Sequence, residues 1–406
     1  MKNPIILICV LCFAVRLLFC YLIFPVFGLP FIENVDIDNF GAIAKNMLHG
    51  YGFVIEPGSP PTLFRGPLYP LSLMLTFSIF GENLYAVQFM QSLLGTLTCF
   101  IIYLIAKKIF DRKTAILSAI IFTFYPLFIW YTARIWTETL LTFLVSILVL
   151  HMIKFLRSPS KTNAFILGII LGVINLCKSI LLLFPIFLLL VFLVLFWHRK
   201  KEVLLNICLI IISMSLVITP WTYRNYKVSG HFVPANMFSV NIIAGDIAIE
   251  KGIVLREYRV VTLREAQEVY NTIIRLEETK IGRQLDIIEQ EMVIVNHLFR
   301  KYLSSPLFFL KKVAIQSVQF WYLGGDKLRC LLFAIMQLTL LIPGLFGIIY
   351  AVRRRYFIAP LLWIIIYTIL IYAISFAAAR YSIPIMPYVG IFAAYAICHG
   401  FRSCPR

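Results

Sequence analysis

Two aspartates and an arginine follow the first hydrophobic stretch of the chain. Asp36 and Asp38 open an aromatic segment that ends at Phe53, and twelve residues later the chain reads Arg65-Gly-Pro-Leu-Tyr-Pro. An ionised carboxylate can accept a proton as a new bond forms. An arginine can bind a phosphate through two parallel hydrogen bonds. These residue types at a membrane surface predict chemistry in which a group leaves a phosphate.

Further ionisable residues lie within or beside short turns, or just past the end of an apolar run. They are Arg134, Glu138, Lys178, Arg224 and Arg380. A charge near the bilayer core is costly, so such residues usually face a water-filled pocket or a charged partner. We expect them to line one cavity with Asp36, Asp38 and Arg65.

The composition excludes a water-soluble globular protein. Of the 406 residues, 61% are hydrophobic and only 14% are charged, and the mean hydropathy is +0.90. Soluble domains are about one-quarter charged. The apolar runs are long and lack the period-2 alternation of a membrane barrel, so we expect them to be helices. The fold class predicted is an all-α polytopic membrane protein.

About ten apolar runs are long enough to cross the ~30 Å hydrocarbon layer, which takes about 20 residues. They are 4–27, 86–106, 114–132, 136–156, 164–178, 179–197, 203–220, 329–350, 357–378 and 383–400. The first exceeds the core of a cleavable signal and is expected to stay as an anchor. Lysines and arginines collect in alternate short loops, which places those loops and both termini in the cytoplasm. On this topology 66–81 is a helix lying in the outer interface.

The predicted organisation has three parts. Residues 1–220 form a transmembrane module that includes the first outer loop, 28–85; residues 221–328 form a small outer-face domain; residues 329–406 return to the membrane. Apolar residues recur at helical spacing from about 263 to 303, and the aromatic, basic stretch after Ser305 is expected to lie along the headgroups. Gly168 and Gly172 predict close packing of two helices.

Several classes of function are disfavoured. Much of the net charge of +18 belongs to cytoplasmic loops that meet anionic lipids, so nucleic acid is not an expected partner. The nine cysteines form no CxxC pair and are expected to be buried apolar residues. The chain has no P-loop, Gly-x-Gly-x-x-Gly or HExxH motif.

Structural roles compete with chemical ones for each candidate. Asp36 or Asp38 can cap the helix predicted from Phe40 to Leu48. Arginines at the surface can anchor headgroups. Glu138 can pair with Arg134 four residues earlier, worth about 0.3 kcal/mol if exposed. Arg16, in the middle of the first run, is assigned no role, because buried pairing or snorkelling to the interface accounts for it.

Transfer of a sugar from a lipid-linked phosphate combines both chemical tools, because a carboxylate accepts the proton of the acceptor and cations neutralise the departing phosphate. The sequence also resembles a known family in order along nearly its whole length. The matching segments are Asp36 to Phe53, Arg65-Gly-Pro-Leu-Tyr-Pro, Gly81, Tyr125-Pro126, Glu138-Thr-Leu, Thr219-Pro-Trp-x-x-Arg-Asn-Tyr226 and Arg380-Tyr-x-x-Pro384. They resemble the signatures of GT-C glycosyltransferases, of the bacterial branch with aminoarabinose transferases and protein mannosyltransferases.

The resemblance implies an inverting transferase in the bacterial inner (plasma) membrane, with a polyprenyl-phosphate sugar donor and an active site facing outside. The catalytic aspartate of the family maps onto Asp36, with Asp38 as second choice, and a further acidic residue maps onto Glu138. Donor-phosphate positions match Arg65, Arg224 and Arg380, with Lys178 as a companion. The expected partners are the lipid-linked sugar, membrane lipids and an acceptor that is a lipid, a glycan or a protein.

Two mild departures from the family pattern stand out: Phe40 replaces the usual tyrosine, and Gly66-Pro67 replaces the Pro-Pro often found after the arginine. In addition, Asp36 is followed by isoleucine instead of the glutamate common in protein mannosyltransferases, which weakens protein as the acceptor. Some relatives bind a divalent cation near the donor phosphate. This chain offers no convincing His/carboxylate ligand set, so no cofactor is certain and a divalent cation stays unassigned.

Two other functions stay open at this point. A secondary transporter or lipid flippase would favour internal repeats and charges at the midplane; no repeat is visible, and Arg16 is the one residue in its favour. A catalytically silent scaffold that presents 221–328 would tolerate loss of Asp36. The enzyme interpretation predicts that Asp36 lies within about a nanometre of Glu138 and Arg65 around one cavity.

Overall fold

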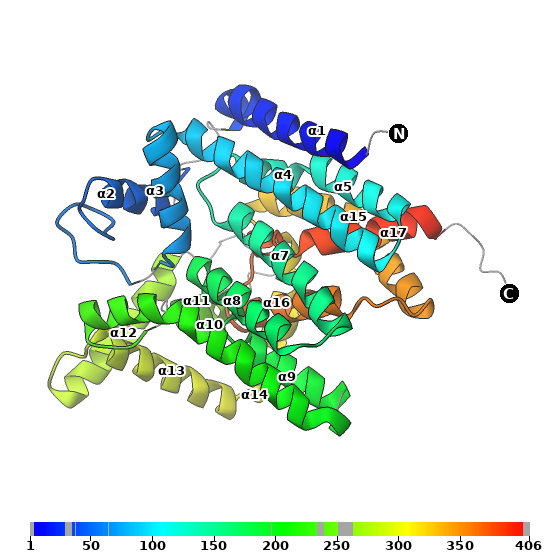
Figure 1. The fold of residues 1–406 in the computed structure, drawn as a ribbon. Coiled ribbons are helices and arrows are strands. Elements are labelled where there is room, and N and C mark those ends of the chain that lie inside the picture. Colours follow the sequence, from blue (N-terminus) through cyan, green and yellow to red (C-terminus); the bar gives the residue numbers. More distant parts are fainter. Residues whose placement is uncertain are drawn as a thin grey trace. The chain divides into compact units, whose positions relative to one another are not determined.

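The computed structural model describes residues 4–28, 35–36, 38–63, 65–195, 197–233, 239–250 and 263–400 (Figure 1). Every regular element in these ranges is a helix, as the composition predicts. The chain divides into two compact units. Unit 1 comprises residues 1–224, 339–365 and 383–406, and unit 2 comprises 225–338 and 366–382. The prediction of a separate outer-face domain, which concerns the side of the membrane, stays a prediction.

Ten of the helical segments coincide with the ten predicted apolar runs. Within the described residues, five helices are long and apolar enough to cross a membrane: Pro4–Val26 (from α1, Pro4–Leu18, and the π-helical η1, Phe19–Gly28), α4 (Leu84–Ile109), α7 (Glu138–Arg157), α10 (Lys200–Ser229) and α15 (Lys327–Arg353). The pair α5 (Arg112–Phe124) and α6 (Pro126–Thr132), bent by 52°, is long and apolar enough to form either a broken sixth span or a re-entrant loop. The chain is therefore an integral membrane protein.

Shorter apolar helices account for the remaining runs. They are α8 (Lys161–Cys177), the segment Ser179–Leu195 formed by η3 (Ser179–Leu181) and α9 (Phe184–Leu195), α16 (Ala359–Ile374) and α17 (Met386–His399). At 1.5 Å per residue, helices of this length are shorter than the ~30 Å hydrocarbon layer. The helix α3 (Leu68–Phe80) has 13 residues, about 20 Å, and its place in the outer interface stays a prediction.

Glycines set the closest helix contacts of unit 1. A Cβ on Gly168 would lie within 2.3 Å of the carbonyl oxygen of Ile210, and one on Gly172 would meet Val217 at 2.6 Å. The helices α8 and α10 therefore touch backbone to backbone, which confirms the prediction of close packing at this pair of glycines. In Figure 1, α4 also runs beside α5 and α7, which pack against it.

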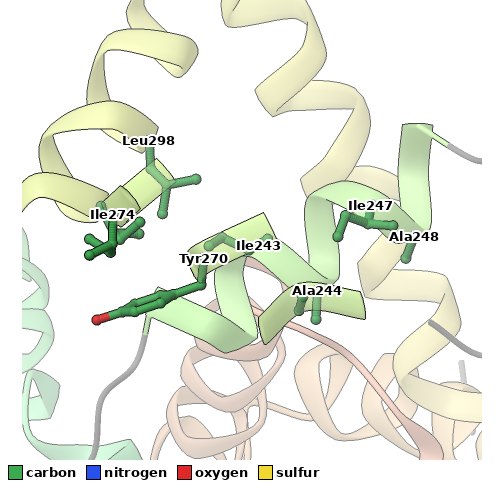
Figure 2. Packing of buried hydrophobic residues seen from close by; sticks show 9 residues of the cluster. Ile243, Ala244, Ile247, Ala248, Tyr270, Ile274 and Leu298 are labelled. Atoms are coloured by element: carbon green, nitrogen blue, oxygen red, sulfur yellow. The ribbon is translucent and has the colours of Figure 1, made fainter. Parts of the chain in front are cut away.

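Unit 2 is built around the helices that follow α10. They are α11 (Ser239–Glu250), α12 (Leu263–Ile281), α13 (Ile287–Ser304), α14 (Pro306–Tyr322) and the short η5 (Ala379–Ser382). Figure 2 shows their apolar core, in which Ile243 of α11 lies near Tyr270 and Ile274 of α12 and Leu298 of α13. The helices α12 and α13 thus form in the region, about 263 to 303, where apolar residues recur at helical spacing in the sequence.

A buried ionic network also holds unit 2 together. Lys312 of α14 is fully buried and bonds Asp246 of α11 at 2.7 Å and the Tyr302 hydroxyl at 2.9 Å. Lys301 bonds the second oxygen of Asp246 and Glu250, both at 2.7 Å. Every charge in this network has a partner of opposite sign, which a buried ion requires.

Candidate functional site

The carboxylate of Asp36 lies over the first turn of α2 (Phe40–Leu48). Its Oδ2 accepts the N–H of Ala42 at 3.0 Å. A Cβ on Gly41 would lie 2.9 Å from the same oxygen, so glycine leaves room for it. Asn39, the residue before the helix, has a left-handed backbone (φ 60°), and its side chain accepts no capping hydrogen bond. Asp36 thus performs the capping that its sequence position allows.

A carboxylate that caps a helix can still act as a base, and this holds for Asp36. Burial raises the pKa of its carboxyl above the ordinary value, the amides of Gly41, Ala42 and Phe40 lower it in part, and Asp38 raises it again. A carboxylate with a raised pKa binds a proton more tightly. This is the property that a general base needs.

Arg65 joins the second aspartate to this corner. Its Nε donates to the carbonyl oxygen of Asp38 at 3.0 Å, and its Nη2 lies 3.6 Å from Oδ1 of Asp38. The guanidinium also lies over the ring of Phe40, 5.6 Å from its centre. Both charged side chains are half-buried. Arg65 is therefore held by the carbonyl and the carboxylate of Asp38 and by the ring of Phe40, and part of its surface stays open to solvent.

The residue after Arg65 brings the first loop against the end of α8. A Cβ on Gly66 would lie 2.4 Å from the carbonyl oxygen of Leu176 and 2.9 Å from that of Cys177. The next residue, Lys178, ends α8, and its Nζ lies 3.8 Å from Oε1 of Glu138. The structure therefore connects Arg65 to Lys178 through one close backbone contact.

Glu138 begins α7 and is only 2% exposed. Arg134 lies in the bend before this helix and not in the helix itself, and its pairing with Glu138 stays a prediction. Lys178, forty residues later in the chain, is a partner of Glu138. A buried carboxylate next to an ammonium is costly to create and is often functional.

Tyr69 lies among the acidic residues and was not identified from the sequence. It is fully buried in α3, and its ring packs edge to face with the ring of Phe40, with 5.2 Å between the two ring centres. Burial raises its pKa well above the ordinary value, and the charges of Asp36, Glu138 and Asp38 raise it further. Three carboxylates from two separate segments therefore act on one hydroxyl group. The only sequence signal for Tyr69 was its place in the Arg65-Gly-Pro-Leu-Tyr-Pro motif.

Gln91 of α4 is a second residue that the sequence did not indicate. It accepts a hydrogen bond of 3.4 Å from Tyr69 and donates to the carbonyls of Thr132 at 3.1 Å and Arg134 at 2.7 Å. Nearby, the N–H of Ile135 donates to the carbonyl of Val35 at 3.2 Å. These bonds tie the first loop and the turn before Glu138 to the same membrane helix.

Arg224 holds the far arm of the first loop. Its Nη1 donates to the carbonyl oxygen of Thr62 at 3.0 Å, and its guanidinium lies 4.7 Å from the ring centre of Trp221 and 5.3 Å from that of Phe53. Asn46 of α2 fastens the same arm by donating to two of its carbonyls. Arg224 thus reaches the site through the loop it binds.

Arg380 belongs to unit 2, in η5. It lies over the ring of Tyr381 at 4.9 Å, and its Nη2 is 3.4 Å from that hydroxyl. The turn that carries it is fixed at both ends, because the Ala379 N–H donates to Leu323 O at 2.9 Å and Ser382 bonds Gln337 at 2.9 Å. Its membership of the same site stays a prediction.

The structure therefore brings five of the seven candidates into one continuous cluster in unit 1: Asp36, Asp38, Arg65, Glu138 and Lys178. Arg224 is joined to it by the loop. Among the described residues, no group of three or more His, Cys, Asp or Glu side chains is placed to hold a metal ion. A divalent cation stays unassigned.

Arg16 is enclosed in unit 1, as buried pairing predicts. It is fully buried, its Nη1 lies 2.6 Å from Sγ of Cys12, and its Nη2 donates to the carbonyl of Phe122 at 3.4 Å. A Cβ on Gly95 would lie 2.5 Å from its Nε, so glycine makes room for the guanidinium. The adjacent cavity has a volume of only about 10 Å³.

The sequence comparison points to one family. Residues 64–223 match the family model described as dolichyl-phosphate-mannose-protein mannosyltransferase, a range that includes Arg65, Glu138 and Lys178. No curated protein sequence gives a significant match to the chain.

Solved structures with a similar fold include the apo oligosaccharyltransferase of Archaeoglobus fulgidus, with a TM-score of 0.59 at 15% identity over 98% of this chain and 50% of that one. The same archaeal enzyme in complex with an inhibitory peptide and a dolichol-phosphate gives 0.54 at 14% identity, covering 100% and 52%. The chain spans about half the length of these proteins. ArnT from Cupriavidus metallidurans bound to undecaprenyl phosphate gives 0.46 at 12% identity, covering 98% and 78%.

At these identities the structural likeness establishes the fold and nothing finer. This chain has the fold of the archaeal oligosaccharyltransferase, and its residues 64–223 match the dolichyl-phosphate-mannose-protein mannosyltransferase family model.

Proposed function

We propose that this protein is an inverting glycosyltransferase that moves a sugar from a polyprenyl-phosphate donor to an acceptor on the outer face of the bacterial plasma membrane. The observation that carries the proposal is the cluster in which Asp36, with a raised pKa, is joined through Asp38 to Arg65. A proton acceptor and a phosphate-binding group then lie at one place. The acceptor is a lipid, a glycan or a protein.

The chemistry follows from the two ends of the cluster. The acceptor nucleophile attacks the sugar carbon that bears the phosphate, and its proton passes to Asp36. The bond from that carbon to the phosphate oxygen breaks, and its electron pair leaves with the polyprenyl phosphate. Attack from the face opposite the leaving group inverts the configuration at carbon. Asp38 is the second candidate for the base.

Cations stabilise the charge that develops on the departing phosphate. Arg65 is the best placed of them, because it is half-buried and held by the Asp38 carbonyl. Lys178, Arg224 and Arg380 are proposed as further phosphate ligands. Glu138, held by Lys178, is proposed to orient the acceptor.

The similar solved structures support a lipid-phosphate donor, since one of them contains a dolichol-phosphate. A transporter or flippase is less well supported. Arg16 was the one residue that favoured transport, and it is enclosed by Cys12, Gly95 and Phe122. Most of the remaining candidate charges gather in one cluster, which suits catalysis at a surface.

The test compares wild type with Asp36→Asn in lipid nanodiscs. Asparagine keeps an oxygen that can accept the Ala42 N–H, so the cap survives while the base is lost. A matched control is Asp286→Asn, which makes the same change at the N-cap of α13 in unit 2. Each protein is mixed with a panel of radiolabelled polyprenyl-phosphate sugars and an envelope extract, and release of polyprenyl phosphate is measured.

We expect Asp36→Asn to lose about 10²-fold or more of the rate and Asp286→Asn to keep it. Equal turnover by wild type and Asp36→Asn would refute the assigned base. If wild type releases no polyprenyl phosphate from any donor but moves lipid across a vesicle bilayer, the flippase alternative replaces the transferase. Comparing the masses of envelope glycans, lipids and glycoproteins with and without the gene identifies the acceptor.

A further inference from the structure

The helix α13 has apolar residues on two faces. On one face Ile294 and Leu298 lie in the core of unit 2. On another, Met292, Val295, Phe299 and Leu303 are each between 52% and 66% exposed. Their spacing of three, four and four residues places these four side chains in one stripe along the helix. A helix that faced water on its outer side would carry polar residues there.

The stripe continues into the next helix. Leu307 and Leu310 of α14 are 81% and 62% exposed, and only Ser305 separates the two helices. Two exposed basic residues adjoin members of this apolar set in the chain: Arg300 follows Phe299, and Lys311 follows Leu310. An exposed apolar surface bordered by positive charge is typical of a helix that lies in the headgroup region of an anionic bilayer.

The helices α13 and α14 are connected along the chain to candidate membrane spans. The block that contains α13 and α14 begins at the end of α10 and ends at the start of α15, and both helices are candidate membrane spans. Only four residues lie between Tyr322 and Lys327, so the end of α14 is within about 18 Å of the start of a candidate membrane helix. The C-terminal end of α14 therefore lies close to the end of a candidate membrane span.

We propose that the apolar surface of Met292, Val295, Phe299, Leu303, Leu307 and Leu310 inserts into the interface of the lipid bilayer. Lipid is its partner. Neither a second protein nor another copy of this chain is needed to cover it. Arg300 and Lys311 then meet lipid phosphates. This inference does not depend on the proposed function.

The anchored helix also holds the turn of Arg380. Gln316 of α14 is fully buried, accepts the N–H of Ala377 at 2.6 Å and donates to the carbonyl of Gly245 at 3.2 Å. The carbonyl of Leu323, just past α14, accepts the N–H of Ala379. Lipid contact by α13 and α14 thus sets the height of Arg380 relative to the phosphate layer.

The experiment places spin labels on the full-length protein in nanodiscs that contain anionic lipid. Cys208, which is exposed, and Cys404 are first replaced by serine, and this protein is checked for residual labelling. Single cysteines are then introduced as Phe299→Cys and Leu303→Cys. The matched control is His297→Cys, an exposed position on another face of α13. Collision rates are measured with oxygen, which concentrates in lipid, and with a water-soluble nickel chelate.

Labels at 299 and 303 are expected to collide several-fold more with oxygen, and several-fold less with nickel, than the label at 297. Nickel access at 299 and 303 equal to that at 297 would place the stripe in water and overturn the proposal. Protection from both reagents would place it in a protein contact and overturn it equally. None of these readings needs a sugar donor, so they stand apart from the transferase assay.

Discussion

The hydroxyl of Tyr69 donates a hydrogen bond of 3.4 Å to Oε1 of Gln91, and both side chains are fully buried. The amide of Gln91 in turn donates to the carbonyls of Thr132 and Arg134. Two neutral residues therefore connect α3, α4 and the turn before Glu138. The spacing between the acidic residues depends on these uncharged groups as well as on ion pairs.

The first prediction concerns Gln91→Leu. Leucine has a similar volume but removes all three hydrogen bonds and leaves buried polar groups without them, at a cost of about 1–3 kcal/mol for each such group. We expect the free energy of unfolding to fall by at least about 2 kcal/mol, measured by thermal or denaturant unfolding in detergent.

Gln267→Leu is the control for this change. Gln267 is an exposed residue of α12, where a surface substitution changes stability by less than about 0.5 kcal/mol. Equal losses in the two variants would mean that Gln91 has no special structural role. Tyr69→Phe, which removes only one bond, should lie between them.

Much of the fold was predictable because its signals are local. Ten apolar runs predicted ten helical segments, and the pair Gly168 and Gly172 predicted the contact of α8 with α10. Runs shorter than a full span, such as α17, were harder, because hydropathy shows where a helix is apolar but not how long its hydrogen-bonded part is.

The candidate site was predictable only in part. Charged residues at membrane surfaces are conspicuous, so Asp36, Arg65 and Glu138 were found from their types and positions. Tyr69 and Gln91 were missed because each sits inside an apolar helix, where a single neutral residue has no distinctive pattern. Lys178 was predicted as a site residue, but its pairing with Glu138 was not, because the two residues lie far apart in the chain and meet only in the folded structure.

The second prediction is a pH dependence. The base must be ionised, and burial and Asp38 both raise the pKa of Asp36. The rate of wild type should therefore fall on acidification at a pH above the ordinary aspartate pKa of about 4. Asp38→Asn removes one of the two raising causes, so the acid limb of kcat/KM should move to lower pH.

The same raised pKa affects stability with a definite sign. The folded state binds the Asp36 proton more tightly than the unfolded chain, so this group contributes less stability as pH rises from the unfolded pKa through the raised one. Asp38→Asn should weaken that dependence, as measured by unfolding at a series of pH values.

The pH profile of the rate can contradict the assignment of Asp36 as the base. It would do so if the acid limb of kcat/KM in Asp38→Asn stayed in place or moved to higher pH. The limb of Asp286→Asn should match wild type.

The third prediction is a double-mutant cycle on Lys178 and Glu138. Lys178→Met leaves a nearly buried carboxylate without this ammonium group, and we expect a loss of about 2 kcal/mol, less than the ~3–5 kcal/mol of a fully buried pair because Lys178 is partly exposed. Adding Glu138→Gln should cost less than the sum of the single changes, with a coupling of about 1 kcal/mol. Strictly additive losses in the free energy of unfolding would show that the two groups do not interact.

The fourth prediction tests the close contact that joins the first loop to α8. In Gly66→Ala the new methyl group would lie 2.4 Å from the carbonyl oxygen of Leu176, and neither backbone segment can yield cheaply. We expect a loss of about 1–3 kcal/mol in the free energy of unfolding, typical of overpacking. Because Arg65 precedes this glycine, the rate of transfer should fall as well.

Gly390→Ala provides the matched comparison within α17. There a Cβ would meet its nearest neighbour, Cγ2 of Ile121, at 3.5 Å, an ordinary van der Waals contact. Alanine is favoured over glycine inside a helix by about 0.5–1 kcal/mol, so this variant should be as stable as wild type or more so. If Gly66→Ala were equally harmless, the first loop would not rest on the end of α8, and the path from Arg65 to Lys178 would be lost.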